Sequence, residues 1–430
     1  MQAWLYRVWR RIPGRAVVWC LLALWLLLAP RVFTSSLSIS LLCQMGIATV
    51  ACLSYNLLMG QGGMLSFGHA VYTGLGAYAA IHALNAAGAG LGAIPVSLIP
   101  LVGGVAGLVV AALLGFISTR KAGTPFAMIT LGLGELVFAA ALMFSGVFGG
   151  EGGVSGNRVV GPPVWGISFG PAVQVYYLIA AYTFAAVAML YAFTHTPLGR
   201  MLNAVRDNAE RAEFIGYNPH RVRYLAFVIA GFFAGISGGL AALHFEIVTP
   251  EVVGAARSGA YLLFTFVGGS TVFFGPVIGA VLMVLAFTLL SEITKAWLLY
   301  LGLLFLGMVL YAPGGIASLI VANLRVARAG RLGPLWVGYL ALAATGLTAL
   351  AGWGAVVEMV YHLQLGAALG PELRFLGMTL NTAHTGAWLG AALVGVTGTL
   401  LFELVRRPLA QQWQTALAEL ERTQQAGGAA

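Results

Sequence analysis

Long, uninterrupted apolar runs recur along the chain and predict membrane-spanning helices. Residues 175–193 and 224–243 are typical of these runs. An apolar helix of about 20 residues crosses a hydrocarbon layer roughly 30 Å thick. The runs are continuous and do not alternate between apolar and polar positions, which excludes a transmembrane β-barrel. The pattern therefore predicts an all-α polytopic membrane protein.

Twelve such segments can be placed, about ten in a core and about two in a C-terminal extension. Glycine-rich stretches interrupt the core segments. We expect one transmembrane domain over residues 1–330 and an extension over 331–430 that ends in a polar tail. The predicted spans cover residues 17–33, 36–58, 70–87, 93–117, 125–147, 172–193, 224–247, 257–272, 275–291, 297–312, 335–353 and 383–404.

Composition agrees with this interpretation, because the chain is 60% hydrophobic and 8% charged. An ordinary soluble domain is roughly 25% charged. The net charge of +9 comes mainly from clusters of Lys and Arg between the spans, so it reports orientation and not nucleic-acid binding. The clusters cover residues 7–15, 120–121, 200–223, 325–331 and 406–422. Even numbers of spans separate them, which predicts a multi-pass protein with both termini in the cytoplasm.

This parity requires the glycine-rich residues 60–67 and 268–275 to turn on the cytoplasmic side or to dip back into the membrane. The first apolar run is short and follows four Arg, and we interpret it as an anchor in preference to a cleaved signal peptide. Cys20, Cys43 and Cys52 lie inside apolar spans without metal-ligand spacing. We expect them to be buried and unpaired, and we predict no metal site.

Residues 196–223 gather eight charges in a chain that otherwise avoids charge. Thr196 before Pro197 has the form of an N-cap, and residues 207–210 (DNAE) have the form of a capping box. Gly216 suits a left-handed helix stop. The stretch therefore predicts two short cytoplasmic helices joined near Arg206, a surface that a partner protein can contact. A solvated loop that merely obeys the positive-inside rule is the alternative.

The same stretch resembles the coupling loop of permeases in the branched-chain amino-acid ABC importer family. Glu210, Ala212 and Gly216 keep the spacing of that loop, although Arg211 replaces the first alanine of the motif. Residues 56–70 (NLLMGQGGMLSFGHA), 274–280 (FGPVIGA) and 313–315 (PGG) resemble further motifs of the family in the same order. The likeness covers about residues 38–320, and the remainder of the chain lies outside it.

The resemblance implies a transport subunit and not an enzyme, with no catalytic residues. It implies a bacterial inner-membrane permease that works with a second permease subunit, ABC ATPase subunits and an extracytoplasmic solute-binding protein, surrounded by membrane lipid. The sequence holds no P-loop motif, so ATP and Mg would bind the partner ATPase and this chain would hold no cofactor. Substrates would be branched-chain or other small amino acids, or urea and short amides. The residues expected to couple to the ATPase are Arg200, Arg206, Asp207, Glu210, Ala212 and Gly216.

The solute pathway is expected where the backbone is broken and polar groups lie at membrane depth, because such groups are tolerated only inside protein or beside water. Glu135 lies within an apolar span, where an acid is costly. It is either a pathway group that meets a substrate ammonium or a paired acid that locks helices together. His69 either makes a packing hydrogen bond or contacts the solute. The candidates are Gly62, Gly63, Ser66, His69, Thr130, Glu135, Gly268 and Gly269.

Two other classes of protein fit parts of the pattern. An ion- or proton-coupled secondary carrier could use Glu135 as its proton site, but it leaves the capped loop unexplained. An intramembrane serine protease could use Ser237 or Ser155, each in a G-x-S-G sequence, with a His from another span. However, Gly231, Gly235 and Gly239 recur every four residues, which is typical of closely packed membrane helices.

Overall fold

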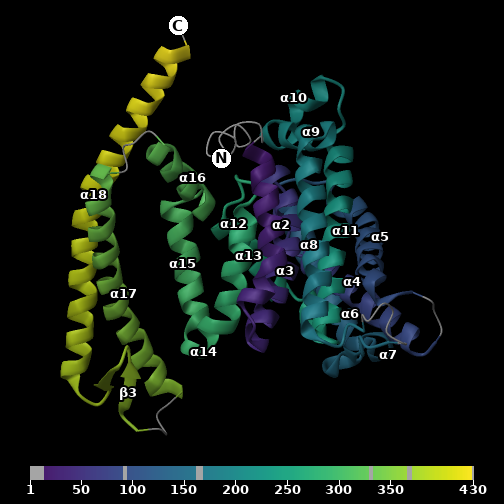
Figure 1. Ribbon diagram of the computed structural model, residues 1–430, viewed down its shortest axis with the longest axis horizontal. Helices are drawn as coiled ribbons and strands as arrows, with labels where there is room; N and C mark the ends of the chain where they lie inside the picture. Colours follow the sequence, from purple (N-terminus) through teal and green to yellow (C-terminus); the bar gives the residue numbers. More distant parts are fainter. Residues whose placement is uncertain (1–13, 91–93, 161–167, 329–332, 366–369, 429–430) are drawn as a thin grey trace, which may run out of the picture. The chain divides into compact units, whose positions relative to one another are not determined.

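The computed structural model describes residues 14–90, 94–160, 168–328, 333–365 and 370–428 (Figure 1). Helices form nearly all of this structure, which confirms an all-α polytopic membrane protein. The chain divides into two compact units, one of residues 1–285 with 313–317 and one of residues 286–312 with 318–430.

The first unit is a bundle of helices joined by short turns, with one small β-ribbon. Its elements are α2 (Gly14–Val32), α3 (Ser36–Asn56), η1 (Leu57–Gln61), α4 (Ala70–Gly88), η2 (Val96–Leu98), α5 (Ile99–Ser118), α6 (Thr124–Met143), α7 (Ser145–Phe148), η3 (Gly150–Gly152), β1 (Val154–Ser155), α8 (Ala172–His195), α9 (Pro197–Asp207), α10 (Ala209–Phe214), α11 (Pro219–Phe245), β2 (Ile247–Val248), η4 (Pro250–Val253), α12 (Ala255–Gly268) and α13 (Gly275–Leu285). The helices α9 and α10 lie at one end of the bundle and α7 lies at the opposite end (Figure 1).

Every predicted span coincides with a helix, but fewer of these helices qualify as full spans than we expected. In the described ranges, eight segments are long and apolar enough to cross a membrane, and the pair α15 (Trp297–Tyr311) and α16 (Gly315–Arg328), bent by 49°, makes a ninth. The predicted count of about twelve also included α2, α4 and α12. The helix α12 falls short because it stops after 14 residues at a glycine break.

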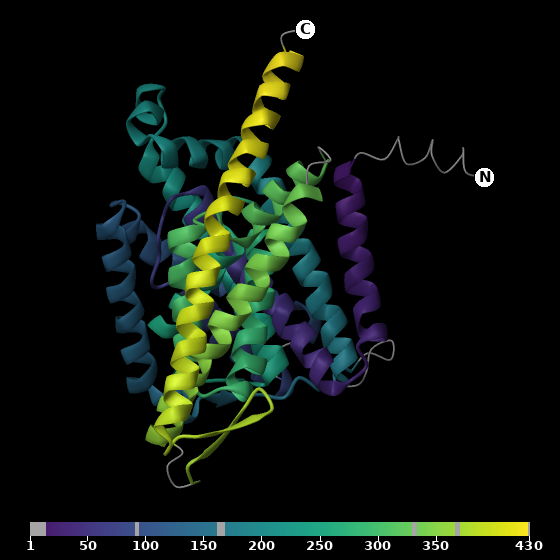
Figure 2. The same cartoon turned by 90° about the vertical axis from the view of Figure 1, so that its left-hand side faces the viewer.

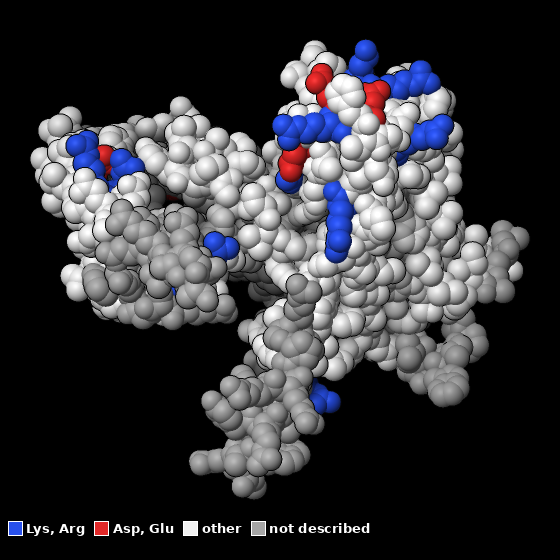
Figure 3. Space-filling model, turned by 90° about the horizontal axis from the view of Figure 1, so that it is seen from above, with Lys and Arg blue, Asp and Glu red and all other residues white. Residues whose placement is uncertain are grey.

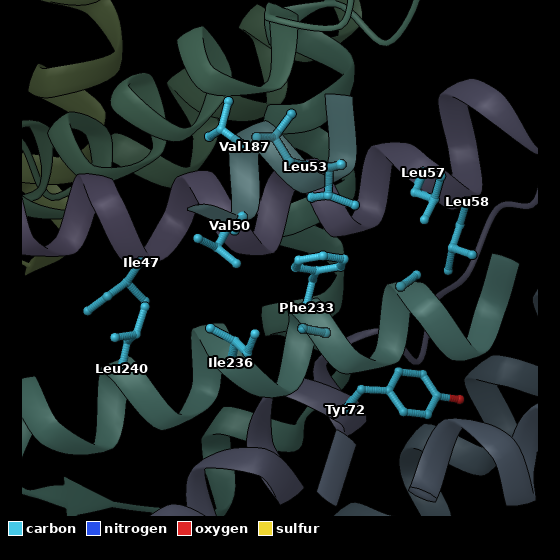
Figure 4. Packing of buried hydrophobic residues seen from close by; sticks show 14 of the residues in the cluster. Ile47, Val50, Leu53, Leu57, Leu58, Tyr72, Val187, Phe233, Ile236 and Leu240 are labelled. Carbon is cyan, nitrogen blue, oxygen red and sulfur yellow. The ribbon is translucent and has the colours of Figure 1, made fainter. Parts of the chain in front are cut away.

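The helices α3 and α11 form the centre of the first unit. Ile47, Val50 and Leu53 of α3 face Phe233, Ile236 and Leu240 of α11 (Figure 4). The helix α11 also packs closely on α5, because a Cβ on Gly235 would lie 2.2 Å from the carbonyl oxygen of Gly103. The glycine stripe of α11 thus serves the close helix packing that its spacing predicts.

The N-terminal helix α2 lies on α8. The Tyr176 hydroxyl donates a hydrogen bond of 2.8 Å to the Leu26 carbonyl, and the Trp19 and Tyr191 rings meet edge to face. Cys43 and Cys52 are buried free thiols, as expected. Cys20 is exposed on α2, so its predicted burial is wrong: an apolar helix at the edge of a bundle needs a partner on one face only.

The second unit contains an antiparallel pair of long helices with a β-hairpin at one end (Figure 2). Its elements are η5 (Ala286–Leu290), α14 (Ser291–Ile293), α15, most of α16, η6 (Gly333–Leu335), α17 (Trp336–Leu365), β3 (Glu372–Phe375), β4 (Met378–Asn381) and α18 (Thr385–Gly428). Glu358 of α17 accepts hydrogen bonds from Thr294 and from Tyr300, the latter at 3.1 Å. The helix α15, which we assigned to the 1–330 domain, therefore packs with the extension; the domain division itself stays a prediction.

Candidate functional site

The charged stretch folds as two short capped helices, α9 and α10. The Thr196 hydroxyl accepts a hydrogen bond from the Gly199 amide, and the Asn208 side chain accepts one from the Arg211 amide. Gly216 has φ +91°, the left-handed stop that we expected after α10. The helix α11 begins at Pro219 under an Asn218 cap, so the last residues of the charged stretch are already helical.

One side of these helices is buried and the other carries an exposed apolar tip. Leu202, Val205 and Ala212 belong to the core of the first unit. Ala212 therefore packs α10 against the core of the first unit, and its role in coupling to the ATPase stays a prediction. In contrast, Phe214 is 89% exposed and Ile215 is 67% exposed. The charged residues of the same two helices are exposed as well: Arg200, Arg206, Asp207, Glu210, Arg211 and Glu213. Figure 3 shows blue and red atoms clustered on a largely white surface.

The buried side of α9 contacts the glycine-rich break that follows α3. The Asn203 side-chain amide donates a hydrogen bond of 2.9 Å to Gln61 Oε1, and the Arg206 guanidinium donates one to the Gly60 carbonyl. Arg206 also pairs with Asp207 at 2.9 Å. A Cβ on Gly63, which has φ +64°, would lie 2.7 Å from Arg206 Cγ. Here α3 ends in the π-helical turn η1, a form that is frequent at functional sites.

All three glycine-containing motifs meet beside α9. A Cβ on Gly60 would lie 2.4 Å from the Ser270 carbonyl oxygen, and one on Gly269 would lie 2.7 Å from the Gly314 carbonyl oxygen. Segments far apart in the sequence are therefore in backbone contact. Both breaks lie on the α9 side of the bundle, as the parity of the spans requires. We call the contact of α9, η1 and these two glycine segments the α9 junction.

Most of the predicted pathway residues are buried in packing. The His69 ring shares a hydrogen bond of 2.9 Å with Ser54 Oγ and lies edge to face with the Tyr55 ring. The Thr130 hydroxyl accepts a hydrogen bond of 3.1 Å from the Phe67 amide. Ser66 is buried, and its carbonyl accepts the Tyr55 hydroxyl hydrogen. His69 thus makes a packing hydrogen bond, and its contact with the solute stays a prediction.

Gly62, Gly268 and Gly269 are also buried, and the role of the buried candidates in the solute pathway stays a prediction. The exceptions are Gly63, which faces Arg206, and Glu135, which is exposed on α6. Glu135 makes no ion pair within the described ranges, so the alternative of an acid that locks helices together finds no support there. The role of Glu135 in the solute pathway stays a prediction.

At the opposite end of the bundle, Arg158 holds the loop after α7. Its guanidinium donates hydrogen bonds to the carbonyls of Phe169 at 2.8 Å and Gly170 at 3.1 Å, and it pairs with Glu246 at 3.4 Å. The strands β1 and β2 pair antiparallel beside it. Strand pairing thus orders Val154 and Ser155 within the glycine-rich residues 149–156.

Hydrolytic and metal chemistry find no support. The buried Ser237 hydroxyl donates a hydrogen bond of 2.8 Å to the Ile47 carbonyl, so it links α11 to α3 and is not poised beside a histidine. No cluster of three metal-ligating side chains occurs among the residues that the structure describes. Sequence reasoning missed Asn203, Gln61, Phe214 and Ile215; only the last two had a signal, as apolar residues inside a charged stretch.

Comparison with known proteins gives matches to one family of transport proteins. Residues 37–313 match the family model described as the branched-chain amino acid transport system permease component. The chain is similar to the high-affinity branched-chain amino acid transport system permease protein LivM of Salmonella typhimurium strain LT2, with 28% identity over 64% of this chain and 68% of the relative. The Escherichia coli K12 LivM protein is 27% identical over the same shares. No solved structure gives a significant match.

Proposed function

The chain belongs to the branched-chain amino-acid permease family and is a permease subunit of an amino-acid importer, and we propose that it is one transmembrane half of an ATP-driven one. In this proposal a second permease chain forms the other half. Separate ATPase subunits bind ATP and Mg, and an extracytoplasmic protein delivers the solute. The protein spans the bacterial inner membrane several times, with both termini in the cytoplasm.

The apolar tip of the coupling loop is the observation that supports an ATPase partner most directly. The helix α10, which is capped by Asn208 and stops at Gly216, lies at one end of the bundle (Figure 1). Its exposed side contacts water unless another protein covers it. Phe214 and Ile215 expose most of their side chains there. Exposed apolar side chains rimmed by charges are typical of a protein interface.

The α9 junction supports the mechanical part of the proposal. A force on α10 passes to α9 and then to η1 through Asn203 and Arg206. The break at residues 268–275 contacts η1 directly, so both glycine breaks respond together. We infer that closure of the ATPase subunits displaces α9 and thereby changes the bend of α3 and α12. The chain needs no catalytic group for this task.

Transport in proteoliposomes tests the proposal. The permease pair with its ATPase subunits and binding protein should take up leucine against a gradient only with ATP and Mg. Uphill uptake by this chain alone, without nucleotide, would instead show a secondary carrier. Phe214→Ala with Ile215→Ala should reduce co-purification of the ATPase. Leu376→Ala removes a side chain that is 70% exposed in the β-hairpin and is the matched control, which should leave co-purification unchanged.

A further inference from the structure

Two opposite charges lie at the same depth of the first unit, near the middle of the membrane. Glu135 is eleven residues after the first residue of α6, Thr124, and Arg257 is eleven residues before the last residue of α12, Gly268. At 1.5 Å per residue, each charge lies about 16 Å from its helix end. That is about half of a 30 Å hydrocarbon layer.

Both of these helix ends lie on the α9 side of the bundle, so the two depths can be compared. The end of α12 meets η1 where Gly60 approaches Ser270. The start of α6 adjoins the first turns of α11, because the Phe126 and Phe227 rings meet edge to face at 5.9 Å. The helix α11 follows α10 directly. Glu135 and Arg257 are therefore level with each other, and not at opposite faces of the membrane.

Both charges also flank the same stretch of irregular backbone, at residues 67–69. The residue after Arg257, Ser258, accepts a hydrogen bond of 2.9 Å from the Ala70 amide. The residue before Glu135, Gly134, approaches Gly68, since a Cβ there would lie 3.4 Å from Gly68 Cα. The helices α6 and α12 thus border the start of α4 from two sides.

Neither charge has a charged partner in the described ranges. The Arg257 guanidinium carbon lies 5.7 Å from the centre of the Tyr261 ring, a neutral group, and Arg257 is only partly buried. Glu135 is exposed. Single charges at this depth are costly, so they normally face a protein interior or a watery path. The exposed face of α6 therefore borders another protein surface or such a path and does not face lipid alone.

We propose that Glu135 and Arg257 are the two poles of a transient site for a zwitterionic amino acid, which rests on the proposed function and names its substrate class. The Glu135 carboxylate accepts hydrogen bonds from the substrate ammonium, and the Arg257 guanidinium donates to the substrate carboxylate. Leu131 and Leu136, both exposed beside Glu135, supply apolar surface for an aliphatic side chain. Urea and short amides lack both charges, so the site favours amino acids over them.

The test uses the complete importer in proteoliposomes, with leucine at saturating binding protein. Glu135→Gln and Arg257→Met should each lower ATP-dependent leucine uptake at least tenfold, while Arg257→Lys, which keeps the charge, should retain more uptake than Arg257→Met. The exchange of both charges, Glu135→Arg with Arg257→Glu, should restore part of the uptake lost in either single exchange. Glu251→Gln, an exposed acid on η4, is the matched control and should transport as the wild type does.

Variants are compared at equal yield of the assembled complex and equal ATP hydrolysis, which separates binding from folding. Wild-type uptake in Glu135→Gln and Arg257→Met would overturn the site and leave the importer function intact. Equal loss in Arg257→Lys and Arg257→Met, together with no recovery on charge exchange, would also overturn it. Failure of the wild-type complex to transport leucine would refute the proposed function itself.

Discussion

The hydrogen bond between Asn203 and Gln61 gives the sharpest test of the route from the ATPase to the membrane. It is a neutral side-chain bond of 2.9 Å in a partly buried place, and it joins α9 to η1. Such a bond contributes about 1 kcal/mol. If that energy links ATPase closure to bending of η1, its loss corresponds to about a fivefold change.

The assay measures leucine transported per ATP hydrolysed by the complete complex. Asn203→Ala and Gln61→Ala should each reduce this ratio about fivefold while ATP hydrolysis continues. Gln61 lies on η1 and away from the proposed ATPase contact, so its effect cannot come from lost docking. Gln44→Ala is the matched control, because Gln44 lies on α3, which η1 continues, and its side chain donates a hydrogen bond of 3.3 Å to Ser40 of α3 itself.

A double-mutant cycle completes the test. If the bond itself transmits the motion, the double variant should be no worse than either single variant, which gives a coupling energy of about 1 kcal/mol. Additive losses would refute the reasoning, since they would show two independent defects. Unchanged transport per ATP in both single variants would refute it equally.

Three further predictions follow from the packing. Gly235→Ala would place a Cβ 2.2 Å from the Gly103 carbonyl oxygen and should lower the free energy of unfolding by about 1–3 kcal/mol, measured as a lower Tm in detergent. Gly302→Ala, which has open space around it, is the control and should not lower the Tm. Equal Tm values for the two variants would contradict the close packing. Asn208→Ala removes the cap of α10, which contributes about 1 kcal/mol to the stability of that helix. Amide hydrogen exchange over residues 209–214 should therefore become about fivefold faster, without a change in α9. Unchanged exchange would show that the cap is not needed. Arg158→Met should make residues 153–160 sensitive to protease, whereas Arg374→Met on the exposed face of β3 should not; equal resistance would show that Arg158 does not hold the loop.

The sequence predicted the helices well because their causes are local. Apolar runs located the spans, and the caps at Thr196 and Asn208 with the stop at Gly216 located α9 and α10. The hairpin of β3 and β4 and the helix α16 were missed. Each strand has only four residues. Leu373 and Phe375 of β3 pack against α17, and the local sequence pattern does not reveal this contact.

The functional residues were harder to predict because their roles depend on distant neighbours. Arg206 was predicted to couple to the ATPase, but the sequence could not show that its guanidinium bonds to a carbonyl 146 positions earlier. Gly62, Gly268 and Gly269 were singled out from the sequence, but the close contacts that they make with other parts of the chain could not be predicted from it. Glu135 could be singled out from composition alone, whereas its relation to Arg257 required the register of α6 against α12.

Glu246 joins two requirements that no single residue type satisfies equally well. Its φ of 56° is a conformation that glycine adopts without penalty, yet its carboxylate accepts the Arg158 amide hydrogen at 2.8 Å and pairs with the Arg158 side chain. A glycine at position 246 would remove the backbone strain, but it would also remove the carboxylate that binds Arg158. We therefore expect residues 158 and 246 to vary together among related sequences, and a sequence that has lost one of them to differ in the turn that they hold.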